Sequence, residues 1–286
     1  MYFTNFSKIE DAENLKQYLR KSERLTYTTS LIHYTKLENL IKIIESGYWI
    51  LKTPDKMNDK IEEEYWLETA PAKLNSMFFA SFMKENKENI GMWIMYGQPW
   101  DDGISISIPK KNFQHWIKNV DRLYRVVENK VFEKDSITLT GNNKPQIVSV
   151  TYLDFEKAKK DRFNNQKELL IYNSVENTNF SNIYNNPNLV GYIKDNAWKS
   201  EKEARLLVDL GPDNSESAIA LKIDNLLDGI TITAGPFFNG DLEEKIKNKL
   251  PGLKFSVNIK SSMYRDKLQK IPCKECNFYN QKENIK

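Results

Sequence analysis

Two residue types that build metal and disulfide sites are almost absent from this chain. Among its 286 residues there are two cysteines and two histidines. Cys273 and Cys276 form one Cys-x-x-Cys near the C-terminus. A zinc site would need two further ligands, and neither histidine is nearby in sequence. The pattern therefore favours an accessible thiol pair in a terminal tail over a zinc site or a redox role, and we expect no metal.

Long apolar runs are absent as well. No run approaches the ~18 residues that a membrane-spanning helix needs, and the N-terminus lacks the basic segment and apolar core of a signal peptide. Hydrophobic residues make up 40% of the chain and charged residues 28%, which is typical of a soluble globular protein. We therefore expect a cytoplasmic protein that does not contact a membrane.

The net charge is small, but it is unevenly distributed. The formal charge of the whole chain is +3. Residues 244–286 contain eleven Lys or Arg and four Asp or Glu, so this segment carries +7 and residues 1–243 carry −4. A basic segment of this size favours a phosphate-rich partner such as RNA or DNA, although scattered lysines are also typical of a solvated surface.

Hydrophobic periodicity predicts interspersed strands and helices. The expected helices cover 8–24, the segment that follows His33-Tyr34-Thr35 and ends at about 46, Asn89–Gly97, Phe113–Val120 and Asp241–Leu250, the last capped by Asn239. The first expected strand begins at about residue 27 and closes with His33-Tyr34-Thr35, and further strands cover Met77–Phe82, 103–108, Gln146–Leu153, Glu203–Leu210, Gly229–Ala234 and Lys254–Ile259. The Asn-rich span 159–190 predicts a helix and a long loop. With no repeat and no linker, we expect a single α+β domain over 1–286, with a helical extension at 1–26 and a tail at 266–286.

His33-Tyr34-Thr35 stands at the junction between a strand and a helix. Leu37, Leu40, Ile41 and Ile44 have helical spacing and Gly47 stands where a left-handed C-cap belongs. On a strand, alternate side chains share a face, so His33 and Thr35 should point the same way and present an imidazole and a hydroxyl to one ligand. The alternative is that His33 is a hydrogen-bonded structural residue.

A second group of polar residues is Glu201-Lys202-Glu203-Ala204-Arg205. If this segment is a strand, Glu201, Glu203 and Arg205 line one face, and the two carboxylates are about 7 Å apart, close enough to share a ligand. Considered alone, alternating charge is more typical of an exposed edge strand, which natural sheets use to prevent pairing.

Together, the two segments resemble the mono-ADP-ribosyltransferase superfamily, in particular the DarT-type bacterial enzymes and a related uncharacterised bacterial family. Similar segments recur there in this order, over roughly residues 30–265 of this chain: Leu31-Ile32-His33-Tyr34-Thr35…Leu40…Ile44…Ser46-Gly47, Pro54…Asn58-Asp59, Ser81-Phe82, Met92-Trp93…Tyr96 and Trp198…Glu201-Lys202-Glu203…Arg205. Lys60 follows Asp59 where the family pattern more often has proline. Ser81, Tyr96 and Ser105 are alternatives for its second motif.

The resemblance implies a split β-sheet core with flanking helices and NAD⁺ as a substrate. Cleavage of the nicotinamide–ribose bond passes through an oxocarbenium-like centre, as glycoside hydrolysis does. By the resemblance, Glu203 is the catalytic carboxylate that binds the ribose 2′-hydroxyl and stabilises the developing positive charge. Glu201 is the carboxylate that activates the acceptor.

The resemblance also assigns the NAD⁺-binding residues. His33 would hold the adenosine-side ribose, the main chain of Tyr34 would meet the carboxamide, and Thr35 would add a hydroxyl. Ser81 belongs to the same pocket, and Trp93 or Tyr96 would stack on the nicotinamide, although such aromatic pairs are more often part of a core.

The expected function is transfer of ADP-ribose to a macromolecule, with RNA or DNA favoured over protein. Such an enzyme would serve as a toxin or a phage-defence effector, and an antitoxin would be a natural partner. The alternatives are an NAD glycohydrolase, which uses the same pocket, and a catalytically inert binding or adaptor module. A metal-dependent nuclease fits poorly, because its acidic cluster with a nearby Lys or His is missing apart from Glu201 and Glu203.

Overall fold

The computed structural model describes residues 28–57, 59–128, 130–156, 189–211, 214, 216–253 and 256–268. The expected helix at 8–24, most of the span 159–190, and both cysteines therefore lie outside the described residues.

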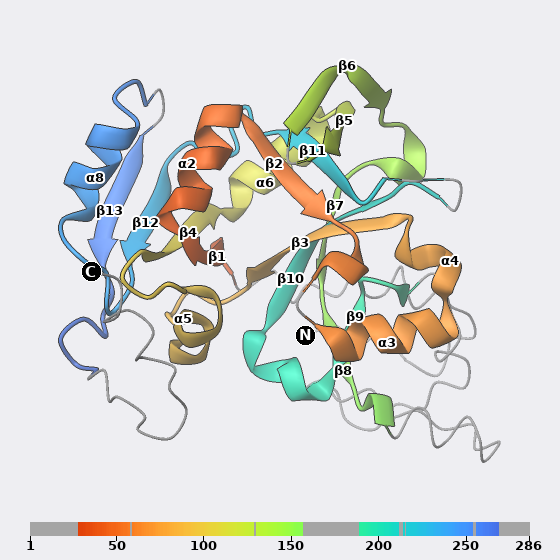
Figure 1. Cartoon of the computed structure of the whole chain (residues 1–286), viewed down its shortest axis with the longest axis horizontal. Coiled ribbons are helices and arrows are strands. Elements are labelled where there is room, and N and C mark those ends of the chain that lie inside the picture. The colour runs from red at the N-terminus through yellow and green to blue at the C-terminus, as the bar shows by residue number, and fades with distance from the viewer. Residues whose placement is uncertain are drawn as a thin grey trace, which may run out of the picture.

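Strands dominate the described part of the chain (Figure 1). The strands are β1 (Ser30–Lys36), β2 (Tyr48–Lys52), β3 (Met77–Met83), β4 (Gly103–Pro109), β5 (Arg122–Val127), β6 (Lys130–Thr138), β7 (Gln146–Ser149), β8 (Thr151–Leu153), β9 (Ile193–Asp195), β10 (Glu203–Asp209), β11 (Ala218–Lys222), β12 (Ile230–Ala234) and β13 (Val257–Ser261). The helices are α2 (Leu37–Ser46), α3 (Lys60–Thr69), α4 (Pro71–Leu74), α5 (Ile90–Tyr96), α6 (Lys110–Asn119) and α8 (Leu242–Lys249), with short 3-10 turns η2 (Pro54–Lys56), η3 (Gly141–Asn143) and η5 (Asn196–Glu201). The prediction of an α+β fold is confirmed in the mixture of helices and strands along the chain.

The main sheet branches at β3. Its strands follow the order β13-β12-β4-β1-β3-β2-β11-β5-β6, and β10 also pairs with β3 and carries β7 on its other edge. β3 pairs with β10 along its whole length, but it meets β1 only at Met83 and β2 only at Phe79. Beyond Ile32, the edge of β1 that faces β3 therefore has no strand partner among the described residues.

Apolar side chains cover both faces of the sheet near this branch. On one face, α2 and α6 pack over β1, β2 and β4 (Figure 1), and the main core contains Leu31, Phe82, Ala204 and Leu206. On the other face, Phe79 and Leu207 pack with residues of α3 and β9, and Ile32, Tyr34 and Met83 pack with α5.

Several local predictions are confirmed. Gly47 ends α2 in the left-handed conformation, at φ 74°, and α5 lies within the predicted helix Asn89–Gly97. In β4 the three isoleucines point into the core, as alternation predicted. Ser105 is buried too, because the opposite face of this strand is also covered.

Two predictions of elements are wrong. Gln146–Leu153 is not one strand, because β7 pairs with β10 whereas β8 pairs with β9 in a separate two-stranded sheet. α8 is capped by Asp241 rather than Asn239, since the Asp241 carboxylate accepts from the Glu244 amide at 3.0 Å. The prediction that His33-Tyr34-Thr35 closes a strand and leads into a helix is confirmed, because β1 runs to Lys36 and α2 begins at Leu37.

Candidate functional site

Glu201 and Glu203 lie on either side of a sharp change in backbone direction. Glu201 ends η5, Glu203 begins β10, and Lys202 between them has φ 47° and ψ 50°. This left-handed conformation is unusual for a residue other than glycine. Only Glu203 and Arg205 therefore share a strand face, and the prediction that Glu201 belongs to the same strand is wrong.

The interpretation of this segment as an exposed edge strand is also wrong. β10 lies between β3 and β7, and Glu201, Glu203 and Arg205 are 3%, 2% and 1% exposed. Charged side chains buried this deeply need partners.

Arg205 is the first of these partners. Its Nε donates to Glu203 Oε1 at 2.7 Å, and its two terminal nitrogens donate to the Glu62 carboxylate at 2.7 and 2.6 Å. The guanidinium also lies 4.2 Å from the centre of the Phe79 ring. Glu62 is held in place by α3, whose first turn is capped by Asp59.

Lys194 on β9 joins the two glutamates from the other side. Its ammonium lies 2.7 Å from Glu201 Oε2, 3.5 Å from Glu203 Oε2 and 3.4 Å from Asp59 Oδ2. Oδ2 of Asp59 is buried and accepts no hydrogen bond from any described residue. A single buried cation therefore holds together carboxylates from α3's cap, η5 and β10.

These residues form one buried group, called the charged cluster below: Asp59, Glu62, Lys194, Glu201, Glu203 and Arg205. It contains four carboxylates and two cations. The sequence predicted Glu201 and Glu203 as site residues, but it predicted no role for Glu62 or Lys194. The acidic run Glu62-Glu63-Glu64 could have indicated Glu62 as a candidate site residue. No local pattern indicated Lys194, which lies beside a stretch without regular hydrophobic periodicity.

The two glutamates of this cluster differ in acidity. Burial by itself would raise the pKa of Glu203, but the charges of Arg205 and Lys194 and the hydrogen bonds that it accepts lower this pKa to about 2. Burial raises the pKa of Glu201, and the neighbouring Glu203 charge adds to this against the opposing effect of Lys194. Two carboxyl groups with separated pKa values are typical of sites that move protons.

Ser81 links the charged cluster to His33. The Ser81 hydroxyl donates to Glu203 Oε1, and its main-chain oxygen lies 2.9 Å from His33 Nδ1. Because a carbonyl oxygen only accepts, Nδ1 carries a proton. Burial lowers the pKa of His33 against the effect of this hydrogen bond, so Nε2 is an unprotonated acceptor near neutral pH.

His33 and Thr35 share a face of β1, as predicted, but it is the face opposite to that of Glu203. The His33 ring packs edge-on against Trp49, at 5.2 Å between centres, and near Phe82 at 5.5 Å. Thr35 accepts a hydrogen bond from Asn39 of α2 at 2.9 Å. The structure thus joins His33 to Glu203 through the backbone and side chain of Ser81, and it does not place Thr35 beside them.

Tyr34 points to the same face as Glu203 and packs against α5. Its hydroxyl accepts from the Asn89 amide at 3.0 Å, and its ring lies edge-on to Trp93 with centres 4.8 Å apart. The Trp93 indole donates to Glu88 at 3.0 Å. The rings of Tyr34 and Trp93 are both buried in the core.

Tyr96, three residues after Trp93 on α5, reaches the charged cluster. Its hydroxyl donates to Glu201 Oε1 at 2.5 Å. Tyr96 and Ser81 are both half-buried, whereas Glu201 and Glu203 are buried. A ligand from solvent would therefore reach the two carboxylates past these hydroxyl groups.

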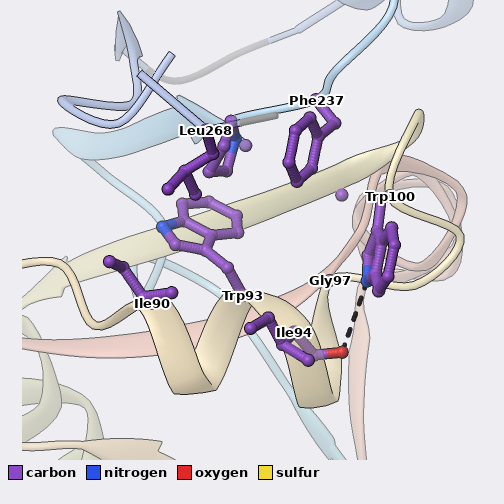
Figure 2. Close-up of a pocket in the computed structure, with 10 residues that line it drawn as sticks. Ile90, Trp93, Ile94, Gly97, Trp100, Phe237 and Leu268 are labelled. Carbon is purple, nitrogen blue, oxygen red and sulfur yellow. Dashed lines mark hydrogen bonds between the residues drawn. The ribbon is translucent and has the colours of Figure 1, made fainter. Parts of the chain in front are cut away.

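An apolar pocket of about 280 Å³ lies beside α5 (Figure 2). It is lined by Ile90, Trp93, Ile94, Gly97, Trp100, Gly103, Gly235, Pro236, Phe237 and Leu268. Trp93 therefore lines this pocket, whereas Tyr96 contacts Glu201 of the charged cluster. The two residues predicted as alternatives for stacking on the nicotinamide thus lie in different sites.

Two further properties concern metals and membranes. Among the described residues, no group of three or more His, Cys, Asp or Glu is arranged to hold a metal ion. None of the helices in the described ranges is both long and apolar enough to cross a membrane.

A known protein family matches part of the chain. Residues 92–206, less than half of the chain, match a family described as "Protein of unknown function (DUF2971)". The matched segment runs from α5 into β10, so it includes Tyr96, Lys194, Glu201, Glu203 and Arg205 but not β1 or α3. No curated protein matches the chain.

Proposed function

We propose that this protein is an NAD⁺-dependent mono-ADP-ribosyltransferase that modifies a macromolecule. The observation that carries the proposal is the buried pair Glu201 and Glu203, which Lys194 joins and whose environments push their pKa values in opposite directions. Glycosyl transfer needs one carboxylate that stays charged and another that accepts a proton.

Glu203 suits the first role. When the bond between C1′ of the ribose and the nicotinamide nitrogen breaks, its electron pair leaves with nicotinamide and C1′ becomes positive. A carboxylate that is ionised at every physiological pH stabilises this centre, and a ribose hydroxyl would take the place of the Ser81 hydroxyl on Oε1. A preorganised interaction of this kind contributes about 10²–10³ in rate.

Glu201 suits the second role. As the acceptor attacks C1′, its proton must go to a base, and the raised pKa of Glu201 makes it the better proton acceptor of the pair. Tyr96, which donates to Glu201 Oε1 from the half-buried side of the site, would yield this position to the acceptor.

The net charge of the cluster favours a positively charged ligand group. Four carboxylates face two cations, and Asp59 Oδ2 accepts no hydrogen bond from the described residues. Excess negative charge in a buried site attracts a cation strongly. The pyridinium ring of NAD⁺ and the positive C1′ that follows it both meet this requirement.

β1 supplies support for the remainder of the dinucleotide. Its edge facing β3 is unpaired beyond Ile32, which leaves main-chain groups near Tyr34 for a carboxamide. Nε2 of His33 makes no hydrogen bond within the described residues and would accept from a ribose hydroxyl. We take the branch of the sheet at β3 as the split core of an ADP-ribosyltransferase-like fold. Thr35, whose hydroxyl already bonds Asn39, has the weakest support.

The acceptor we favour is RNA or DNA, because residues 244–286 carry an excess of seven positive charges. The experiment is incubation of the protein and cell extract with NAD⁺ labelled on its adenylate phosphate, followed by separate nuclease and protease digestion. Transfer predicts label on a macromolecule, with wild-type protein and not with Glu203→Gln. Release of the label by nuclease would identify a nucleic acid acceptor.

Two other outcomes would replace the proposal. Conversion of NAD⁺ to free ADP-ribose without labelled macromolecule would identify an NAD glycohydrolase. Intact NAD⁺ and no label, in extracts from several sources, would point to a binding module that lacks this chemistry.

A further inference from the structure

The apolar pocket beside α5 is separate from the charged cluster. Along the helix, Ile90, Trp93, Ile94 and Gly97 face the pocket, and Tyr96, at a different angle of the 3.6-residue turn, faces Glu201. Figure 2 shows the Trp93 ring at the centre of the pocket, with Phe237 and Leu268 above it and Trp100 at one side.

Three glycines fix the shape of the floor. A Cβ atom at Gly103 would lie 2.3 Å from the Gly97 oxygen, and one at Gly235 would lie 2.8 Å from the Gly103 oxygen and 3.1 Å from the Trp93 ring. Backbone segments before β4 and after β12 therefore pack directly on one another and on Trp93. The three glycines therefore contribute backbone and no side chain to the pocket, next to the rings of Trp93, Trp100 and Phe237.

The lining also limits the chemistry of a ligand. None of the ten lining residues is charged. The Trp93 indole N–H donates to Glu88 at 3.0 Å and the Trp100 N–H donates to the Ile94 oxygen at 3.3 Å, so neither indole has its donor left for a ligand. A volume of about 280 Å³ lies just below the usual range for ligand pockets, ~300–1,000 Å³. It accommodates one ring system rather than a dinucleotide.

We propose that this pocket binds the planar aromatic ring of a small uncharged molecule. The ring lies on the glycine floor and packs against Trp93, Trp100 and Phe237, since offset and edge-to-face contacts between aromatic rings are favourable. The driving force is removal of apolar surface from water. The proposal does not depend on NAD⁺ chemistry at the charged cluster.

Titration of the whole chain with indole, followed by calorimetry and by saturation-transfer NMR, tests the proposal. We expect saturable binding of one indole, with weaker binding of cyclohexylmethanol, which is apolar but not aromatic, and of benzoate, which is charged. Phe237→Ala should weaken indole binding roughly tenfold, and Ile94→Trp should abolish it by filling the entrance, because Ile94 is 50% exposed and tolerates a larger side chain.

The matched control is Phe132→Ala, which removes an exposed phenylalanine from β6 at the far edge of the sheet and should leave binding unchanged. Absence of indole binding to the wild type at millimolar concentrations would overturn the proposal. So would indole binding that is the same in wild type, Phe237→Ala and Ile94→Trp. Since no NAD⁺ is present in this experiment, its failure would leave the proposed transferase activity unaffected.

Discussion

Replacing Glu203 by glutamine separates the catalytic role proposed for this residue from its role as a buried counter-ion. Glutamine keeps the size of the side chain, whereas alanine would leave a cavity and strip the Arg205 Nε of its acceptor. The change removes one negative charge from a residue that accepts hydrogen bonds from Arg205 at 2.7 and 3.2 Å and from Ser81. Both stability and catalysis should therefore respond.

The magnitude of the loss in stability follows from the remaining partner of Arg205. Breaking a buried ion pair costs about 3–5 kcal/mol, but Arg205 keeps both hydrogen bonds to Glu62, so we expect the lower figure, about 3 kcal/mol. For a chain of this size, each kcal/mol shifts Tm by about 2 °C. Glu203→Gln should thus lower Tm by about 6 °C and remain folded at 25 °C.

The loss in activity should be far larger. Removal of the charge that stabilises C1′ should slow release of nicotinamide from NAD⁺ by about 10²–10³, measured by chromatography at 25 °C where both proteins are folded. Glu62→Gln is the matched control, because it breaks the other half of the same Arg205 pair. It should lower Tm similarly and slow the reaction much less. If Glu203→Gln lost the expected stability yet released nicotinamide at the wild-type rate, Glu203 would be a structural counter-ion only.

Three further predictions concern binding and pH. His33→Ala should weaken NAD⁺ binding about tenfold through loss of one hydrogen bond and of packing, whereas the exposed His115→Ala should not; equal affinities in a binding titration would make His33 purely structural. Wild-type protein should bind the cation 1-methylnicotinamide more tightly than neutral nicotinamide, and Asp59→Asn should reduce this preference about tenfold; an unchanged preference would contradict the argument from charge. The stability that Glu203 provides is present above the ordinary carboxyl pKa of 4.5 and is lost as pH falls from 4.5 towards 2. The pKa of Glu201 is raised, so the contribution of Glu201 to stability falls as pH rises above 4.5. In denaturant titrations, the advantage of wild type over Glu203→Gln should thus shrink at low pH and its advantage over Glu201→Gln should shrink at higher pH; parallel pH profiles would refute the assignment.

Strong local signals in the sequence predicted individual elements well. The alternation of serine and isoleucine identified β4, and the apolar spacing before Gly47 identified α2 and its left-handed C-cap. Elements without such signals were missed. β5 and β6 are largely exposed and polar, and α3 has a mixed face because its buried positions include Glu62.

The sequence by itself was enough to predict Glu201, Glu203 and His33 as candidate site residues, because their types and spacing are local properties. It could not determine which residues would neutralise them. Glu62 belongs to α3, which is far along the chain from β10, and Lys194 belongs to β9. Only the pairing of strands and the packing of α3 bring Glu62 within hydrogen-bonding distance of Arg205, and Lys194 within that distance of Glu201. The same packing buries Glu203, which local alternation of charge had suggested would be exposed. Tertiary structure therefore decided the acidity of both glutamates, since burial and opposite charge act through space and not along the chain.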